Sequence, residues 1–192
     1  MWPWEHLAAA YVLYSIVSRI VLGRPPKAWD TLAVVVGSQL PDLIDKPLAW
    51  TFGVTETGYS IGHSIFFATA LCLVVFLVAS RYGERVLAGA FTLAYVSHLG
   101  TDVYDPLRPN PTYEPRVVLW PLESPPADDH GGLLDHFGIY FLRYVDEILA
   151  GGLTPPVVMQ LFLGGAVVVL WIVDGAPIAA DAWRWLRTQL RA

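Results

Sequence analysis

The sequence contains almost no cysteine and few charged residues. The single cysteine, Cys72, lies in the middle of an apolar run, so the chain has neither a disulfide framework nor a cysteine metal cluster. Charged residues make up only 15% of the 192 positions, whereas hydrophobic residues make up 55%. The net charge of −5 argues against a nucleic-acid partner. A composition this apolar is instead typical of an integral membrane protein.

Five apolar runs have the length of a membrane-spanning helix, which needs about 20 residues to cross a hydrocarbon core of about 30 Å. They cover residues 4–22, 29–48, 62–80, 86–104 and 156–173. Pro41 and Asp42 are expected to break the second run. The first residues lack the basic segment and cleavage site of a signal peptide, so the first helix is expected to be retained. We therefore predict one all-α membrane domain over residues 1–192, with about five transmembrane helices.

Two amphipathic helices are predicted outside these spans. Apolar residues recur at helical spacing from Leu134 to Ile148, within the long loop 105–155. They recur again from Trp183 to Leu190, within the tail 174–192. We expect both helices to lie on the membrane surface, the first on the outer face and the second on the cytoplasmic face.

The basic residues are distributed unevenly among the connections between the predicted spans. Those that follow the first, third and fifth spans are Arg19, Arg24, Lys27, Arg81, Arg85, Arg184, Arg187 and Arg191. The opposite side has only Lys46, Arg108, Arg116 and Arg143. The positive-inside rule therefore predicts a multi-pass protein of the cytoplasmic membrane with its N-terminus outside and its C-terminus in the cytoplasm.

Ionisable side chains occur at several ends of the apolar runs, although such groups are costly in lipid and usually face a cavity or a partner. In the orientation inferred from the basic residues alone, all of them reach the outer membrane face. They are His6, Asp42, Asp45, His63, His98 and Asp102. We infer that they converge on one site.

Imidazoles and carboxylates together form a ligand set that suits Zn²⁺, with Mn²⁺ or Fe²⁺ as alternatives. His98 and Asp102, four residues apart, share one face of a helix, as do Asp42 and Asp45, three residues apart. Carboxylates near the C-terminal end of a helix oppose its dipole, and their placement calls for a compensating cation. Taken singly, the same residues also have ordinary explanations, such as an interfacial histidine at His6 or carboxylates that cap a turn.

The predicted roles divide the set into ligands and supporting groups. The main metal ligands are Asp42, His63, His98 and Asp102, and His6 completes the set. Asp45 is the candidate general base, with Asp42 as the other carboxylate considered for catalysis, and Ser64 is a hydroxyl that orients a ligand. His130 and His136, in the outer loop, are ordinarily solvated but can cover the site.

The ordered motifs resemble those of the YdjM-like family of membrane-bound metal-dependent hydrolases. They are the early His6, the acidic motif Pro41-Asp42-Leu43-Ile44-Asp45, the pair His63-Ser64, and His98-Leu99-Gly100-Thr101-Asp102. The similarity covers about the first 125 residues, including Trp120-Pro121-Leu122. It implies hydrolase activity but no particular substrate.

A second resemblance, carried by the order of the same residues, is to the helical zinc-dependent phospholipases C and related nucleases. Those enzymes hold clusters of zinc ions with further histidines and a glutamate. Here only His130, His136 and loop acids are available, at spacings that do not match.

These observations favour a metal-dependent hydrolase whose site opens at the outer membrane–water boundary, where a lipid phosphoester is the natural substrate. A non-catalytic protein that binds or transports a metal is the first alternative, although transporters usually place polar groups near the bilayer midplane. A structural membrane protein with a buried polar network and no metal is the second. Membrane lipids are the expected partners, and the sequence leaves the oligomeric state open.

Overall fold

The computed structural model describes residues 1–107, 111–127 and 132–190, and in these ranges it is helical, without a β-strand. Seven α-helices and one short 3-10 helix are present in them. They are α1 (Pro3–Val21), α2 (Ala28–Trp50), α3 (Ile65–Arg81), α4 (Arg85–Val103), η1 (Pro115–Val118), α5 (Leu133–Gly151), α6 (Pro155–Val173) and α7 (Ala179–Gln189). The predicted all-α fold is confirmed.

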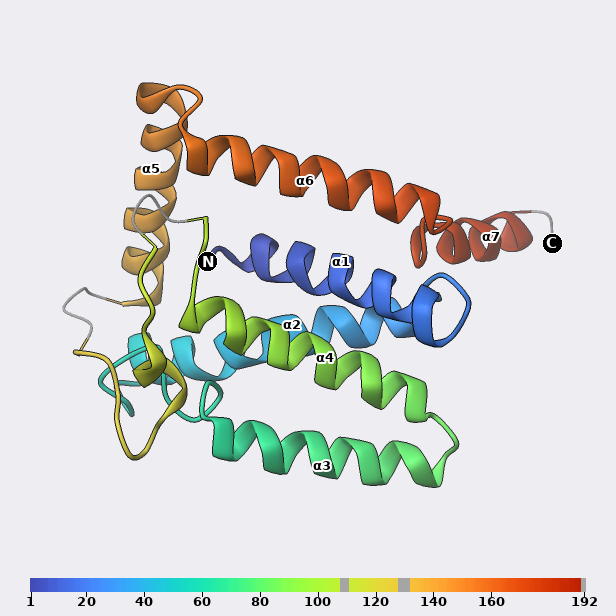
Figure 1. Cartoon of the computed structure of the whole chain (residues 1–192), viewed down its shortest axis with the longest axis horizontal. Helices are drawn as coiled ribbons and strands as arrows, with labels where there is room; N and C mark the ends of the chain where they lie inside the picture. The colour runs from blue at the N-terminus through green and yellow to red at the C-terminus, as the bar shows by residue number, and fades with distance from the viewer. Residues whose placement is uncertain (108–110, 128–131, 191–192) are drawn as a thin grey trace.

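The long helices lie lengthwise beside one another, and the shorter elements gather at the two ends of this bundle (Figure 1). Helices α1, α2, α3, α4 and α6 form the bundle, α5 stands across one end, and α7 lies at the other end. The two amphipathic helices predicted from the sequence correspond to α5 and α7. The connection between α2 and α3 lies at the α5 end.

Two helix boundaries differ from the sequence expectation. Helix α2 was expected to break at Pro41, but it continues through both Pro41 and Pro47 to Trp50. A proline inside a helix removes one main-chain hydrogen bond without necessarily ending the helix. Helix α3 begins at Ile65 rather than at residue 62, because Ser64 caps it and its Oγ accepts a hydrogen bond from the Phe67 amide.

Only one helix in the described part of the chain, α6, is both long and apolar enough to cross a membrane by length and composition. Helix α3 is apolar but has 17 residues. The five predicted spans are therefore not confirmed. Helices α1, α2 and α4 have a lower mean hydropathy than α3 and α6 because each of them carries polar side chains, which the structure buries.

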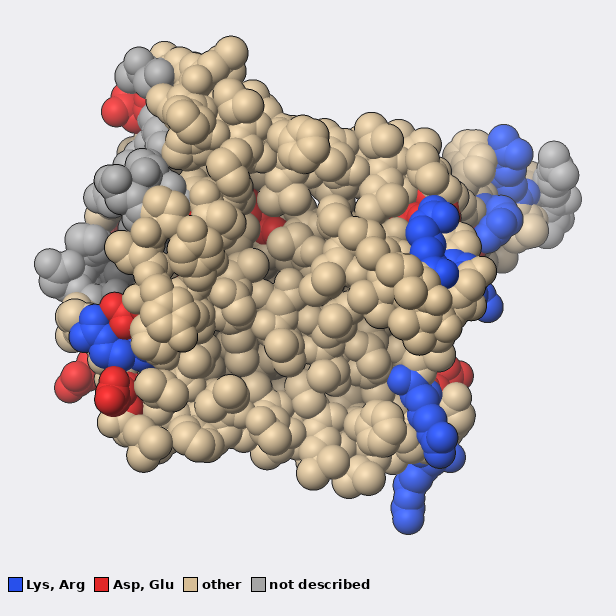
Figure 2. Space-filling model, in the orientation of Figure 1, with Lys and Arg blue, Asp and Glu red and all other residues tan. Residues whose placement is uncertain are grey.

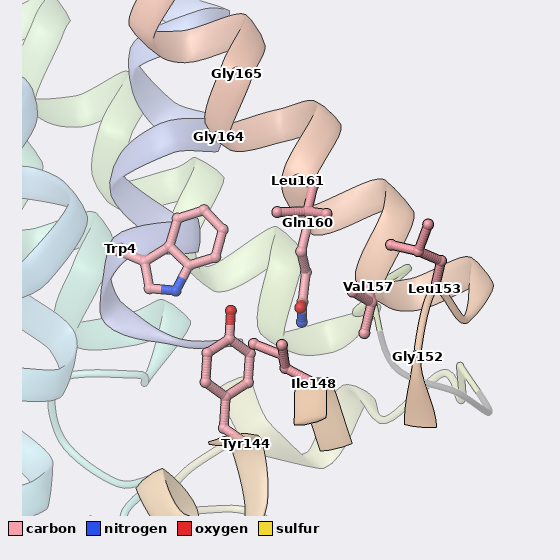
Figure 3. A pocket seen from close by; sticks show the side chains of 10 residues that line it. All are labelled: Trp4, Tyr144, Ile148, Gly152, Leu153, Val157, Gln160, Leu161, Gly164 and Gly165. Carbon is pink, nitrogen blue, oxygen red and sulfur yellow. The ribbon is translucent and has the colours of Figure 1, made fainter. Parts of the chain in front are cut away.

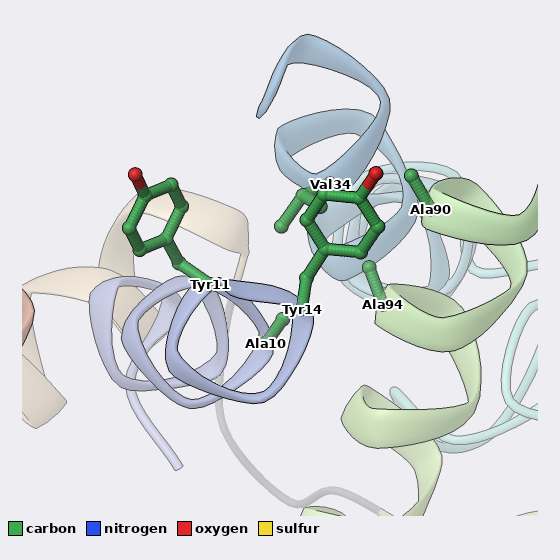
Figure 4. Packing of buried hydrophobic residues seen from close by; sticks show 6 residues of the cluster. All are labelled: Ala10, Tyr11, Tyr14, Val34, Ala90 and Ala94. Carbon is green, nitrogen blue, oxygen red and sulfur yellow. The ribbon is translucent and has the colours of Figure 1, made fainter. Parts of the chain in front are cut away.

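Small side chains and tyrosines fill the centre of the bundle (Figure 4). One cluster joins α1, α2 and α4 and consists of Ala10, Tyr11, Tyr14, Val34, Ala90 and Ala94. The ring of Tyr14 lies beside Val34 of α2 and beside Ala90 and Ala94 of α4. Small residues at these contacts let the helices approach closely.

Helices α2 and α4 approach each other closely at Gly37. A Cβ atom built on Gly37 would lie 2.4 Å from the main-chain oxygen of Phe91, a distance that no side chain can accept. The two main chains therefore touch at this point, and only glycine permits the contact.

A buried carboxylate ties the end of α6 to α1. Asp174, the residue that follows α6, accepts hydrogen bonds from the Tyr11 hydroxyl at 2.9 Å and the Ser15 hydroxyl at 2.7 Å. Its other oxygen pairs with the Arg19 guanidinium at 2.5 Å, and the Asp174 side chain is fully buried. Hydroxyl and guanidinium donors thus balance this carboxylate at the end of the bundle near α7.

Charged side chains are concentrated at the ends of the molecule (Figure 2). Lysines and arginines gather at the α7 end, and the face over the long helices is almost free of charge. The exposed side chains on these helices are instead large and apolar, including Ile16, Leu32, Val74, Val96 and Phe162. The bundle therefore presents an apolar belt between two polar ends.

Candidate metal centre

Three segments bring histidine and aspartate side chains together at the α5 end of the bundle. Asp42 comes from the last third of α2, His63 from the turn before α3, and His98 and Asp102 from the end of α4. One ligand atom from each of these four residues lies within 4.8 Å of all the others. Four of the six residues expected to converge therefore do so, and the group could hold a metal ion.

The innermost atoms of the group are two imidazole nitrogens and one carboxylate oxygen. His63 Nε2 lies 3.1 Å from His98 Nε2 and 3.1 Å from Asp102 Oδ2. His98 Nε2 lies 3.2 Å from the same Asp102 oxygen. Asp42 Oδ1 is farther away, at 3.6 Å from His63 Nε2 and 3.8 Å from His98 Nε2.

The partners of the other ring nitrogens fix the tautomers of both histidines. His98 Nδ1 lies 2.7 Å from the main-chain oxygen of Ser38, which can only accept, so Nδ1 carries the hydrogen. His63 Nδ1 lies 2.8 Å from Asp45 Oδ2 and donates in the same way. In their neutral forms, both rings therefore turn an Nε2 lone pair toward Asp102 Oδ2, and three electron-pair donors face one another without a hydrogen between them.

A divalent metal fits this donor set. A histidine that binds zinc usually donates its other ring N–H to a carboxylate or a main-chain carbonyl, as both rings do here. Ligands at about 2.0–2.1 Å from a tetrahedral zinc ion are separated from one another by about 3.3 Å. The separations of 3.1 and 3.2 Å between the inner atoms are close to that value.

Asp45 supports His63 rather than facing the inner atoms. Its side chain is fully buried, and it accepts hydrogen bonds from the amides of Ser60, Gly62 and His63 at 2.7, 2.7 and 2.9 Å. Together with the bond to His63 Nδ1, these contacts engage both carboxylate oxygens. This geometry favours an orienting role for Asp45 over the general-base role that the sequence indicated.

Asp42 lies at the accessible edge of the group. Its side chain is 9% exposed, whereas those of His63 and His98 are fully buried. Its Oδ2 pairs with Lys46 Nζ at 2.5 Å, one helical turn further along α2. The Lys46 ammonium balances part of the charge at this edge and was not among the residues singled out from the sequence.

His6 contacts the Asp102 oxygen that the other two histidines do not face. His6 Nε2 lies 3.3 Å from Asp102 Oδ1, and its ring stacks on His98 with 3.8 Å between the ring centroids. The amino group of Met1 lies 3.5 Å from the same Asp102 oxygen. His6 is thus next to the centre but not among the four residues whose ligand atoms converge.

The remaining predicted residues lie elsewhere or outside the description. The Ser64 hydroxyl donates to the Trp120 carbonyl at 2.6 Å, and this contact joins the start of α3 to the connection after η1. His130 lies outside the described residues, and His136 is described only as a backbone position in α5. Neither of these two histidines can be assigned to the centre.

Several groups that shape the centre were missed by the sequence reasoning. The Tyr95 hydroxyl donates to the Gly62 carbonyl at 2.5 Å, and a Cβ atom on Gly62 would lie 2.7 Å from the Pro41 carbonyl. These contacts hold the turn that carries His63 against α2. The Ser38 carbonyl, which orients His98, belongs to the main chain and leaves no signal in side-chain patterns.

The fold and the centre define a class of protein: a helical bundle with an apolar exterior and a buried group of histidines and aspartates that can hold a metal. The chain belongs to the family of YdjM inner membrane proteins, whose family model matches residues 1–178. This match includes all the residues of the centre and confirms the resemblance seen in the motifs. No curated protein and no solved structure matches the chain.

Proposed function

We propose that the chain is a membrane-embedded, metal-dependent hydrolase. The observation that carries this proposal is the convergence of His63 Nε2, His98 Nε2 and Asp102 Oδ2 at 3.1–3.2 Å while both Nδ1 atoms donate elsewhere. Zinc fits these ligands best, with manganese or iron as alternatives.

The distribution of side chains supports a protein that crosses the membrane through α1, α2, α3, α4 and α6. Buried positions in α1, α2 and α4 hold mainly small, polar or aromatic residues, and the exposed positions of the long helices hold leucine, isoleucine, valine and phenylalanine. This is the reverse of a water-soluble helix bundle, and a large exposed apolar surface marks a membrane or partner interface. The basic residues at the α7 end support a cytoplasmic C-terminus and an outer metal centre.

Each protein group in the centre has a distinct role. A metal bound here would lower the pKa of a water molecule and polarise a phosphoryl oxygen. His63, His98 and Asp102 are the three inner ligands, in keeping with catalytic zinc sites, which retain an open position. Asp45 and the Ser38 carbonyl hold the two imidazoles in place. Asp42, at 3.6–3.8 Å from the two imidazoles, would be the carboxylate available to accept a proton from a water molecule.

The position of the centre suggests the substrate. The ligands lie at one end of an apolar bundle, which places them at headgroup depth if the long helices cross the bilayer. A lipid phosphoester brings its scissile bond to that depth, so we propose lipid phosphoesters as the substrate class.

Metal analysis with a matched variant tests the proposal. Elemental analysis of the detergent-purified protein should find about one equivalent of zinc, manganese or iron, which His98→Ala loses at equal folded yield. Asp42→Asn should retain the metal but lose the metal-dependent release of phosphate or headgroup from lipid vesicles. A wild-type protein that holds no metal after gentle purification and reconstitution would rule out the hydrolase.

A second candidate is a structural network without metal. His63 lies between two carboxylates, with Nδ1 at 2.8 Å from Asp45 and Nε2 at 3.1 Å from Asp102. A proton on Nε2 in place of the metal would complete hydrogen bonds to both. This reading predicts no bound metal and only a loss of stability in His98→Ala, so the same elemental analysis separates the two candidates.

A further inference from the structure

Lys46, near the end of α2, lies at the edge of the metal centre. Its Nζ is 2.5 Å from Asp42 Oδ2, while Asp42 Oδ1 lies 3.6 Å from His63 Nε2 and 3.8 Å from His98 Nε2. A single carboxylate group therefore separates the Lys46 ammonium from the two imidazoles.

This edge is also where the centre is least buried. The side chains of His63 and His98 are fully buried, and that of Asp102 is only 2% exposed. The Lys46 side chain, by contrast, is 25% exposed. A molecule that approaches the inner ligands from outside would therefore meet Lys46 and Asp42 first.

The apolar hollow between α1, α5 and α6 lies apart from this edge (Figure 3). Its volume is about 490 Å³, and Trp4, Tyr144 and Val157 are among the residues that line it. None of the described residues that line this hollow belongs to the metal centre. The edge at Asp42 and Lys46 is therefore the better approach for a substrate.

The surroundings of Lys46 suit the headgroup of a phospholipid. Its Nζ lies 5.7 Å from the centroid of the Trp50 ring, and indole rings favour the headgroup layer of a membrane. Leu43, about one turn before Lys46 on α2, and Phe52, just beyond the end of α2, are 67% and 69% exposed. An ammonium with exposed apolar side chains close by in the sequence fits a ligand that has both an anionic group and an acyl chain.

Lys46 also changes the charge of the centre. Asp42, Asp45 and Asp102 bring three carboxylates together. A divalent ion bound here would balance two of them, and the Lys46 ammonium balances the third. The amino group of Met1, which also lies near Asp102, is 3.3 Å from a fourth carboxylate, that of Asp105. Without Lys46 the centre would keep a negative charge and repel an anionic phosphoester.

We propose that Lys46 binds an anionic phosphoryl oxygen of the substrate and so selects phosphoesters over uncharged esters. An ammonium has three N–H donors, so Lys46 can hold a phosphoryl oxygen while it keeps its contact with Asp42. The phosphoryl group then lies beside Asp42, the carboxylate available to accept a proton. The inference rests on the proposed function and names the residue that recognises the substrate.

Side-chain NMR of the lysines tests this binding without turnover. The sequence contains only Lys27 and Lys46, so isotope-labelled lysine gives two side-chain signals, which the Lys27→Met variant assigns. The full chain is supplied with zinc in a maltoside detergent, which has no phosphate, and short-chain phosphatidylglycerol is added. The Lys46 signal should shift and saturate, whereas that of Lys27, which is exposed and directly precedes α2, should not respond.

Two further additions identify the source of the anion. Inorganic phosphate has the same phosphoryl chemistry without acyl chains, and short-chain diacylglycerol has the chains without the phosphate. A response of Lys46 to phosphatidylglycerol at a lower concentration than to inorganic phosphate would identify a lipid headgroup, and equal responses would identify free phosphate. Diacylglycerol should leave both lysine signals unchanged.

Substitution of Lys46 gives a second, kinetic measurement. Lys46→Met keeps a long side chain but removes its charge, and it should raise KM for phosphatidylglycerol about tenfold, with a smaller change in kcat, as expected for loss of a charge-assisted hydrogen bond. Lys46→Arg, which keeps the charge, should recover most of this loss. Lys27→Met is the matched control and should leave KM unchanged. Elemental analysis should find the same metal content in all three variants.

Two outcomes would overturn the inference. The first is a Lys46 signal that responds to neither phosphate compound, or that responds to diacylglycerol as strongly. The second is a KM in Lys46→Met equal to that in Lys27→Met. A protein that binds no metal and releases no headgroup, but whose Lys46 signal still responds to phosphatidylglycerol, would instead refute the hydrolase and leave Lys46 as an anion-binding residue. The two failures are therefore distinguishable.

Discussion

The two ends of the helix bundle each bury carboxylates, but they balance them differently. Near α7, Asp174 receives hydrogen bonds from Tyr11 and Ser15 and pairs with Arg19. Near α5, Asp102 Oδ2 instead faces two imidazole nitrogens whose hydrogens are committed elsewhere. A carboxylate that has its own donors is a complete structural link, whereas one that faces two imidazole nitrogens can share with them either a metal ion or a proton. Burial of charge alone therefore does not mark a candidate metal centre, and the direction in which the neighbouring ring nitrogens donate is the more informative feature.

The largest expected effect comes from removing one carboxylate at each end. Asp102→Ala should abolish metal binding, because it removes an oxygen within 3.2 Å of both Nε2 atoms. Asp174→Ala should keep the metal and lower the free energy of unfolding by about 1–3 kcal/mol, since buried hydroxyl donors lose their acceptor. Elemental analysis and thermal unfolding in detergent measure the two effects. If both variants lost the metal, or neither did, the proposed difference between the two ends of the bundle would be wrong.

Removing the metal should destabilise the protein, and this effect should depend on the residues at the α5 end and not on Asp174. A ligand that binds only the folded state stabilises it by about 2.7 kcal/mol at a free concentration one hundred times its Kd. Adding a strong chelator should therefore lower the unfolding temperature of the wild type and of Asp174→Ala by similar amounts. His98→Ala should not respond to the chelator, and a response of equal size in that variant would place the metal elsewhere.

A smaller effect is expected from Asp45, which holds His63 without facing the inner atoms. Asp45→Asn keeps the size of the side chain but weakens the acceptor at His63 Nδ1, and loss of such a support typically costs 10–100-fold in metal affinity, about 1.4–2.7 kcal/mol. Competition titration with a metal-binding dye measures the affinity. An Asn variant with unchanged affinity would show that the main-chain contacts alone position the imidazole.

The smallest effect is expected at Ser64, whose hydroxyl caps α3 and donates to Trp120. Ser64→Ala should lower the free energy of unfolding by about 1 kcal/mol, as expected for loss of a helix N-cap, without changing the metal content. Thermal unfolding gives the first value and elemental analysis the second. A loss of metal in Ser64→Ala would instead support the ligand-orienting role expected from the sequence.

Sequence patterns predicted the helices and the convergent residues because both depend on local periodicity and on the cost of polar groups in lipid. The apolar periodicity located α5 and α7, and the placement of His63, His98, Asp42 and Asp102 at run ends predicted their meeting. The family match over residues 1–178 agrees with the motifs.

The roles within the centre were less predictable because they depend on tertiary contacts. Asp45 was predicted as a candidate general base, but the amides of the turn that follows α2 surround its carboxylate, and this contact could not be foreseen from the sequence. The break expected at Pro41 and Asp42 was also wrong, since α2 continues through the proline to Trp50 while it packs along α4.

The contact at Gly37 bears on which ions the centre can accept. Asp42, His98 and Asp102 all belong to α2 and α4, whose main chains touch at Gly37, so the spacing between the two helices is set by atoms that cannot change rotamer. A calcium ion needs oxygen ligands at about 2.3–2.6 Å and more of them than this frame brings together. If the centre holds a metal, its preference for small over large ions would therefore depend on a helix crossing about one and a half turns of α2 away from Asp42.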